Sequence, residues 1–106
     1  MRTPTDCKTM AELRAEIDTL DRRLVGLLAE RARYIDRAAA LKPGEGLPAR
    51  IDTRVEAVVA NVCDAAADTG LDPALAERLW RVLIDWSIAR EEETLGPSAP
   101  DRLEES

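Results

Sequence analysis

Apolar residues recur from Met10 onward at alternating spacings of three and four positions. This spacing places them along one side of an α-helix and predicts a single long amphipathic helix over about 9–42. Thr9 and Glu12 have the spacing of a capping box at its start, and a Pro-Gly pair ends the pattern. The stripe comprises Met10, Leu13, Ile17, Leu20, Leu24, Leu27, Arg31, Tyr34, Ala38 and Leu41.

Two shorter helices are predicted after the first one. The same helical periodicity runs over about 50–69 and again over about 72–95. Gly70 supplies the stop signal of the second helix, because glycine readily adopts the left-handed conformation common at helix ends. Asp72 is the expected N-cap of the third helix, with Pro73 at its first helical position.

The remaining segments lack helical or strand patterns. Residues 1–8 are expected to form an extended lead-in, and residues 43–48, rich in Pro and Gly, a mobile loop. Residues 96–106 combine Gly, Pro and acidic residues, which is typical of a flexible tail. The chain of 106 residues is therefore expected to be one all-α domain, 1–106, of three helices.

The length of the first helix predicts an assembly. At 1.5 Å per residue, a helix over 9–42 spans about 51 Å. A compact chain of this size has a diameter of only about 35 Å, taking a radius of gyration near 13 Å. The helix must project beyond its own domain with its apolar stripe still on it. A second copy that covers the overhang predicts an intertwined helical homodimer.

Arg31 occupies a position in the apolar stripe where a leucine is expected. A charge on a buried seam is costly unless an anion meets it, either a ligand or a structural partner such as Glu16 or Glu30. Lys42 lies about 16 Å further along the helix on nearly the same face, so both side chains could close on one ligand. Arg14 is about 42 Å from Lys42 and could join only from an antiparallel partner chain. Without such a site, Arg14 and Lys42 would be ordinary solvated charges.

Composition narrows the classes of function. The net charge of −6 disfavours general binding to nucleic acid or to an anionic membrane, so a cationic site must be local. The chain has no His, the commonest general base and metal ligand, and Cys7 and Cys63 match no metal or redox spacing. No signal peptide and no membrane-spanning apolar run are present. These features predict a soluble cytoplasmic protein with free thiols.

The segment 13–31, LRAEIDTLDRRLVGLLAER, resembles the opening helix of the all-helical chorismate mutases. Lys42 falls where that family has its ether-contacting lysine, and the three-helix layout continues the resemblance to about Leu95. The start, residues 2–7, looks more like the small bacterial isochorismate pyruvate lyases, which share the fold.

The resemblance implies a pericyclic reaction, the rearrangement of chorismate to prephenate within one molecule, which needs no covalent intermediate, metal or cofactor. Such a reaction needs a dicarboxylate held in a reactive conformer and stabilisation of the charge that develops at the breaking ether. By similarity, Arg31 and Arg14 of the partner subunit bind the two carboxylates through paired hydrogen bonds. Lys42 would donate to the ether oxygen.

The third helix is expected to supply a second ether contact. Glu91 stands where many family members have glutamine, so it would have to be protonated to donate a hydrogen bond. Ser87 matches a family serine near the substrate ring hydroxyl, and Arg54 a family arginine at the start of the second helix. Ile51 replaces an acid found in many mutases three positions before Arg54, which favours lyase-like or altered specificity.

Three functions follow from these residues. Chorismate mutase is the expected activity, and an isochorismate pyruvate lyase, which forms salicylate and pyruvate, is the alternative enzyme. A catalytically inactive dimeric helical module that binds a partner or senses a metabolite is the third. In that case Glu91 would begin a solvated acidic run, and Ser87 would be a spacer on a helix face.

Overall fold

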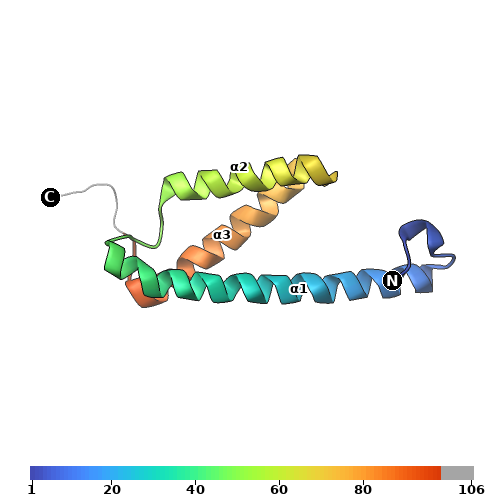
Figure 1. The fold of residues 1–106 in the computed structure, drawn as a ribbon, viewed down its shortest axis with the longest axis horizontal. Helices are drawn as coiled ribbons and strands as arrows, with labels where there is room; N and C mark the ends of the chain where they lie inside the picture. Colours follow the sequence, from blue (N-terminus) through green and yellow to red (C-terminus); the bar gives the residue numbers. More distant parts are fainter. Residues whose placement is uncertain (99–106) are drawn as a thin grey trace. The chain divides into compact units, whose positions relative to one another are not determined.

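The computed structural model describes residues 1–98 of the chain (Figure 1). The described residues are helical without strands, and the first helix is the longest, so the predicted all-α class with three helices is confirmed. The chain divides into two compact units, Met1–Tyr34 and the residues from Ile35 onward. The elements in order are η1 (Pro4–Asp6), α1 (Met10–Leu41), η2 (Lys42–Glu45), α2 (Asp52–Thr69) and α3 (Pro73–Leu95).

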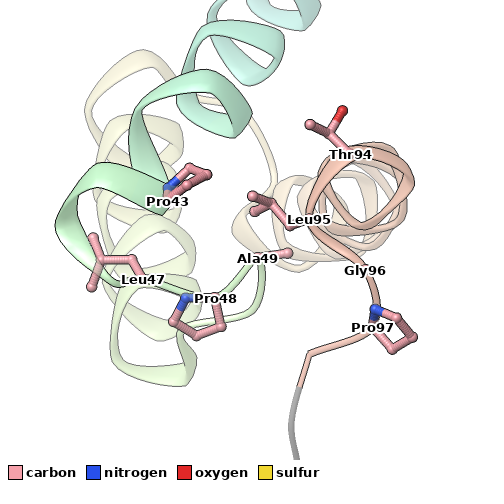
Figure 2. Close-up of a pocket in the computed structure, with 8 residues that line it drawn as sticks. All are labelled: Pro43, Leu47, Pro48, Ala49, Thr94, Leu95, Gly96 and Pro97. Carbon is pink, nitrogen blue, oxygen red and sulfur yellow. The ribbon is translucent and has the colours of Figure 1, made fainter.

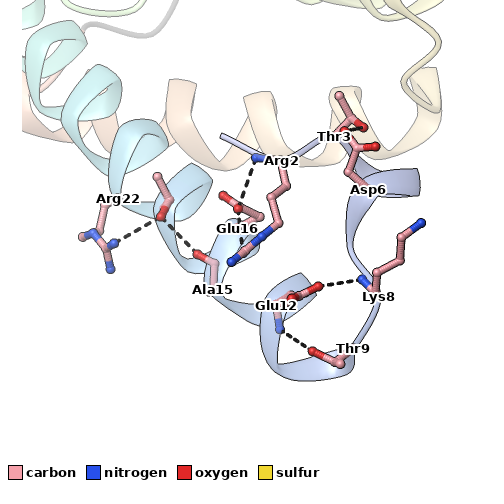
Figure 3. Close-up of polar contacts among 10 residues, drawn as sticks. Arg2, Thr3, Asp6, Lys8, Thr9, Glu12, Ala15, Glu16 and Arg22 are labelled. Atoms are coloured by element: carbon pink, nitrogen blue, oxygen red, sulfur yellow. Dashed lines mark hydrogen bonds and ion pairs between the residues drawn. The ribbon is translucent and has the colours of Figure 1, made fainter.

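The start of α1 is fixed by a capping box that differs from the expected one in a single bond. The Glu12 backbone N–H donates to Thr9 Oγ1 at 3.1 Å, as the sequence predicts (Figure 3). Glu12 Oε1 accepts from the backbone N–H of Lys8 at 2.7 Å, one residue earlier than the usual return bond. The two bonds satisfy donors that would otherwise be unpaired at the helix start.

The expectation that residues 1–8 form an extended lead-in is wrong for the middle of this segment. Residues Pro4–Asp6 form a 3₁₀ turn, and Thr3 Oγ1 donates to Asp6 Oδ2 at 2.6 Å. Arg2 then contacts the second turn of α1, because its backbone N–H and its guanidinium both donate to Glu16 Oε2, at 3.2 and 3.0 Å (Figure 3). Pro4 favours the turn because its ring fixes φ, and the contact of Arg2 with Glu16 holds the segment against α1.

In the first unit, no other described segment buries the apolar stripe of α1. No side chain from Met10 to Tyr34 is buried. Leu13 is partly buried, and the exposed large apolar side chains range from 40% exposed at Leu28 to 71% at Tyr34. A Cβ added at Gly26 would meet no atom within 4 Å. The exposed apolar side chains of this segment are Met10, Ile17, Leu20, Leu24, Val25, Leu27, Leu28 and Tyr34.

The second unit carries the hydrophobic core, which lies between α2 and α3. Buried residues from both helices and from the connection before α2 form one cluster: Ala49, Val59, Ile84 and Ile88. Partly buried side chains pack around it: Val55, Val58, Cys63, Trp80 and Leu95. This small aliphatic core holds α2 and α3 together as a helical hairpin (Figure 1).

The turn between α2 and α3 follows the sequence signals closely. Gly70 adopts φ +84° and ends α2, and Asp72 caps α3 by accepting the backbone N–H of Ala74 at 3.0 Å. Pro73 is the first residue of α3, as predicted. α2 begins at Asp52 rather than near residue 50, because Ile51 is still extended, with φ −128° and ψ 103°.

Two predicted loops contain ordered contacts. The segment 43–48, expected to be a mobile loop, contains most of the 3₁₀ turn η2, which starts at Lys42 and which Gly46 ends at φ +69°. In the expected tail, Ser98 makes hydrogen bonds, and residues 99–106 lie outside the described part of the chain. None of the helices described between residues 1 and 98 has the length and apolarity to cross a membrane.

Candidate active site

Lys42 and Glu91 form an ion pair that connects the end of α1 to α3. Lys42 Nζ donates to Glu91 Oε1 at 2.6 Å and to the backbone carbonyl of Ala49 at 2.8 Å. The Glu91 side chain is 5% exposed and that of Lys42 17%, so the pair is largely shielded from water. Charge-assisted hydrogen bonds of this length are among the stronger ones in proteins.

Glu91 is buried because it shares a helix face with core residues. Ile84, Ser87, Ile88 and Glu91 follow spacings of three and four along α3, and all four are buried. The two isoleucines anchor this face in the core and carry Glu91 inward with them. An unpaired carboxylate in such a place would be strongly destabilising, and the Lys42 ammonium compensates for it.

The Lys42 ammonium has one more proton than its two contacts use. An ammonium has three N–H donors, and the bonds to Glu91 and Ala49 occupy two of them. The third can donate to a further acceptor at an orientation that the other two fix. The site can therefore present one positioned cationic donor to an oxygen where negative charge develops.

Ser87 lies on the same face of α3, one turn before Glu91. Its side chain is buried, and its Oγ donates to the Leu83 carbonyl at 2.7 Å. Arg54 lies in the first turn of α2 and is exposed; within residues 1–98 its side chain makes no hydrogen bond or ion pair. Lys42, Glu91, Ser87 and Arg54 thus belong to one structural unit.

Arg14 and Arg31 belong to the other unit, on the N-terminal part of α1. Arg14 is exposed and Arg31 is partly buried. They lie 17 positions apart on one continuous helix, about 26 Å along its axis. Both arginines of one chain therefore cannot touch the same small molecule. Their roles toward a ligand stay predictions.

An exposed ion pair fixes α1 against α3 close to Lys42 and Glu91. Arg90 donates to the two carboxylate oxygens of Asp36 at 2.8 and 3.2 Å. The hydrogen bond from Arg90 lowers the pKa of the Asp36 carboxyl below its usual value, and the charge of Arg90 adds to this. Asp36 lies six residues before Lys42, and Arg90 is next to Glu91. The pair therefore helps to hold the two elements that supply the buried pair.

A pocket of about 410 Å³ lies beside Ala49, between the connection before α2 and the end of α3 (Figure 2). Its walls are mostly apolar: Pro43, Leu47, Pro48, Ala49, Thr94, Leu95, Gly96 and Pro97. Nothing in the sequence pattern predicted this pocket. Ala49 both lines it and supplies the carbonyl that holds Lys42.

The sequence placed Lys42 and Glu91 in one site but did not foresee that they contact each other. The available signal was the position of Glu91 on the face that Ile84 and Ile88 bury, which demands a cation close by. Nothing in the sequence indicated that Ala49 accepts a hydrogen bond from Lys42, because every residue type has a backbone carbonyl. The protonation of Glu91 during turnover stays a prediction.

Comparison with known proteins identifies the family. Residues 13–92 match the family described as chorismate mutase type II. The chain is also 35% identical over 92 residues to an isochorismate pyruvate lyase from Pseudomonas aeruginosa, a match that covers 86% of this chain and 89% of the relative. The matched region includes Arg14, Arg31, Lys42 and Glu91, on a fold of three helices. The chain therefore belongs to the type II chorismate mutase family.

Proposed function

We propose that this protein is a chorismate mutase that rearranges chorismate to prephenate by holding and electrostatically stabilising the substrate. The observation that carries the proposal is the buried contact between Lys42 and Glu91, at the two positions that the sequence predicted for the ether contacts. Membership of the family supports the same reaction class.

The proposed mechanism uses Lys42 as the donor to the ether oxygen. The bonds to Ala49 and Glu91 orient the ammonium, and its third N–H meets the oxygen on which charge builds as the C–O bond breaks. The same molecule forms the new C–C bond, so no group leaves the site. Arg31 and Arg14 of the partner subunit would hold the two carboxylates, which fixes the reactive conformer. Arg54 and Ser87 would contact the remaining oxygens of the substrate.

A second candidate is isochorismate pyruvate lyase activity, which cleaves isochorismate to salicylate and pyruvate. It is favoured by the relative of that name, at 35% identity. Ile51, in place of an acid before Arg54, also favours it, because the ring hydroxyl then lacks one polar contact. This reaction also breaks an ether bond in a dicarboxylate, so Lys42 would have the same role.

The proposed active enzyme is a homodimer with two shared sites. The exposed apolar side chains of α1 support it, since apolar patches of this kind commonly mark protein interfaces. On α3, Leu79, Val82 and Trp86 are also 48–69% exposed and share one face. A second copy that covers both faces would bring Arg14 of the partner subunit to the opposite site.

One assay with both substrates tests the proposal. Purified protein is mixed with chorismate, and prephenate formation is followed; salicylate fluorescence is followed in parallel with isochorismate. We expect prephenate formation that Lys42→Ala slows by about 10²- to 10³-fold. Salicylate without prephenate would replace the mutase assignment with the lyase. Binding of a dicarboxylate transition-state analogue without turnover of either substrate would identify an inactive binding module.

A further inference from the structure

The peptide group between Ala49 and Arg50 is held at both of its ends. Its carbonyl oxygen accepts a hydrogen bond from Lys42 Nζ at 2.8 Å, and its N–H donates to Ser98 Oγ at 2.9 Å. The peptide unit is planar, so the direction of the N–H also fixes the direction of the carbonyl. Ser98 therefore acts on the same rigid group that orients the Lys42 ammonium.

Ser98 is itself anchored to α3. Its backbone N–H donates to Glu92 Oε2 at 3.0 Å, and Glu92 is the neighbour of Glu91. The backbone hydrogen bond from Ser98 lowers the pKa of the Glu92 carboxyl, with further contributions from the Ser98 side chain and the charge of Arg50. The ionised carboxylate is thus the favoured partner of Ser98. Glu91 therefore contacts Lys42 directly, whereas Glu92 is connected to Lys42 through Ser98 and the peptide group of Ala49 and Arg50.

We infer that Ser98 is a positioning residue for Lys42, acting through the peptide group of Ala49 and Arg50. Glu91 contacts the ammonium directly, whereas Ser98 fixes the carbonyl that accepts its second hydrogen bond. An effect of Ser98 on the rate of turnover rests on the proposed function, in which Lys42 donates to the ether oxygen of the substrate. The positioning of the ammonium itself does not depend on which substrate is turned over.

A purely structural role for Ser98 makes a different prediction. In that case Ser98 would only hold residues 96–98 against the start of α2, beside the pocket that Gly96 and Pro97 line. Its loss would lower the free energy of unfolding and leave the Lys42 ammonium unchanged. A readout on Lys42 itself therefore separates the two roles.

The chain contains only two lysines, Lys8 and Lys42, so ¹⁵N-lysine labelling gives an assignable ammonium spectrum. Hydrogen exchange and chemical shift of the Lys42 ammonium are measured in the full chain and in three variants. Ser98→Ala removes the acceptor of the Arg50 N–H; Ser98→Thr retains a hydroxyl. Arg50→Ala is the matched control, because it removes the guanidinium contacts with Asp85 and Asp52 but keeps the backbone N–H.

We expect Ser98→Ala to speed Lys42 ammonium exchange severalfold and to move its shift, whereas Ser98→Thr and Arg50→Ala resemble the unmodified protein. In the assay with both substrates, Ser98→Ala should lower kcat by about tenfold and change KM little, since the effect is on a transition-state contact. Ser98→Thr should restore kcat.

Unchanged Lys42 signals in a folded Ser98→Ala variant would overturn the inference, whatever the turnover. Altered Lys42 signals in a protein that turns over neither substrate would support the positioning role and reject the proposed function. Loss of folding in Ser98→Ala is recognised by circular dichroism. Ser98→Thr then decides the matter, since a Thr variant with fast Lys42 exchange contradicts the role of the hydroxyl.

Discussion

Lys42 and Glu91 depend on each other because the contact between them is largely buried. A buried ion pair contributes little net stability compared with apolar residues of the same size, but one charge left alone is strongly destabilising. Glu91 is the more enclosed of the two, so it loses more when its partner is removed. The pair is therefore not expected to add much net stability, and this agrees with the proposed role of Lys42 toward a substrate.

Removing one member of the pair should cost more stability than removing both. Lys42→Met leaves the buried Glu91 carboxylate unpaired, and we expect a loss of about 3 kcal/mol in the free energy of unfolding. The double variant Lys42→Met/Glu91→Met should recover most of this loss. Urea unfolding at one fixed protein concentration measures both values. A double variant no more stable than Lys42→Met would contradict the mutual dependence.

The negative charge of the Glu91 carboxylate should limit the rate in the proposed site. A carboxylate repels a dianionic substrate and cannot donate a hydrogen bond to it. In Glu91→Gln, the amide oxygen can still accept from Lys42 and the NH₂ group can donate, so we expect the rate to rise about tenfold. Initial rates of the two proteins, measured in the same buffer, give the difference.

Glu93→Gln is the matched control, since Glu93 belongs to the same acidic run but is exposed. It removes one negative charge without changing the buried pair, so its rate should equal that of the unmodified protein. If Glu91→Gln is no faster than the unmodified protein, the charge of Glu91 does not limit the rate.

At the scale of elements, α1 and α3 are joined by the exposed pair of Asp36 and Arg90 in the second unit. The pKa of Asp36 is lowered by the hydrogen bond from Arg90, so the folded state favours the ionised carboxyl. The resulting stability is present above the usual pKa of aspartate, about 3.9, and is lost as the pH falls through the lower folded value.

Asp36→Asn should therefore reduce the acid sensitivity of the protein. We expect the unmodified protein to lose more stability than Asp36→Asn between pH 6 and pH 2.5 (roughly either side of the aspartate range), as measured by urea midpoints. Asp64→Asn, on the exposed side of α2 without an ion pair in residues 1–98, serves as the control and should behave like the unmodified protein. Equal acid sensitivity in Asp36→Asn would show that the pair does not contribute.

The elements were predictable where their signals are local. Gly70, Asp72 and Pro73 define a turn by their own backbone preferences, and the structure places the turn there. The contact between Lys42 and Glu91 joins positions 49 residues apart, so its existence depends on packing. The bond between Arg50 and Ser98 was not predictable either, because it uses a backbone N–H and a segment with the composition of a tail.

At the scale of the whole molecule, the proposed dimer makes each site depend on two chains. Lys42 and Arg31 of one chain would act with Arg14 of the partner subunit. Two variants that are each inactive should therefore complement each other when their chains exchange. In a mixed dimer, one site combines Lys42 from the Arg14→Ala chain with Arg14 from the Lys42→Ala chain, so this site is intact. The other site lacks both residues.

Mixing Arg14→Ala with Lys42→Ala after unfolding and refolding should restore activity. At equal amounts, half of the dimers are mixed and each has one intact site, so we expect about a quarter of the activity of the unmodified protein. As the control, each single variant is mixed with the double variant Arg14→Ala/Lys42→Ala, and no dimer in these mixtures has an intact site. Absence of recovery in a dimeric mixture would place Arg14 outside the site or within its own chain's site.

The 25 helical residues from Met10 to Tyr34 contain no buried side chain, and this has a consequence for how the chain reaches its folded form. Most of the stability of a helix in a protein comes from packing of its apolar face, and the described residues leave this face exposed. The α2–α3 hairpin has its own core and no such limitation. In the proposed dimer, dilution should therefore melt the N-terminal half of α1 first, so helicity should depend on protein concentration. In the proposed dimer, folding of the chain and assembly would then be one coupled event, since the longest helix would become stable only on contact with a second copy.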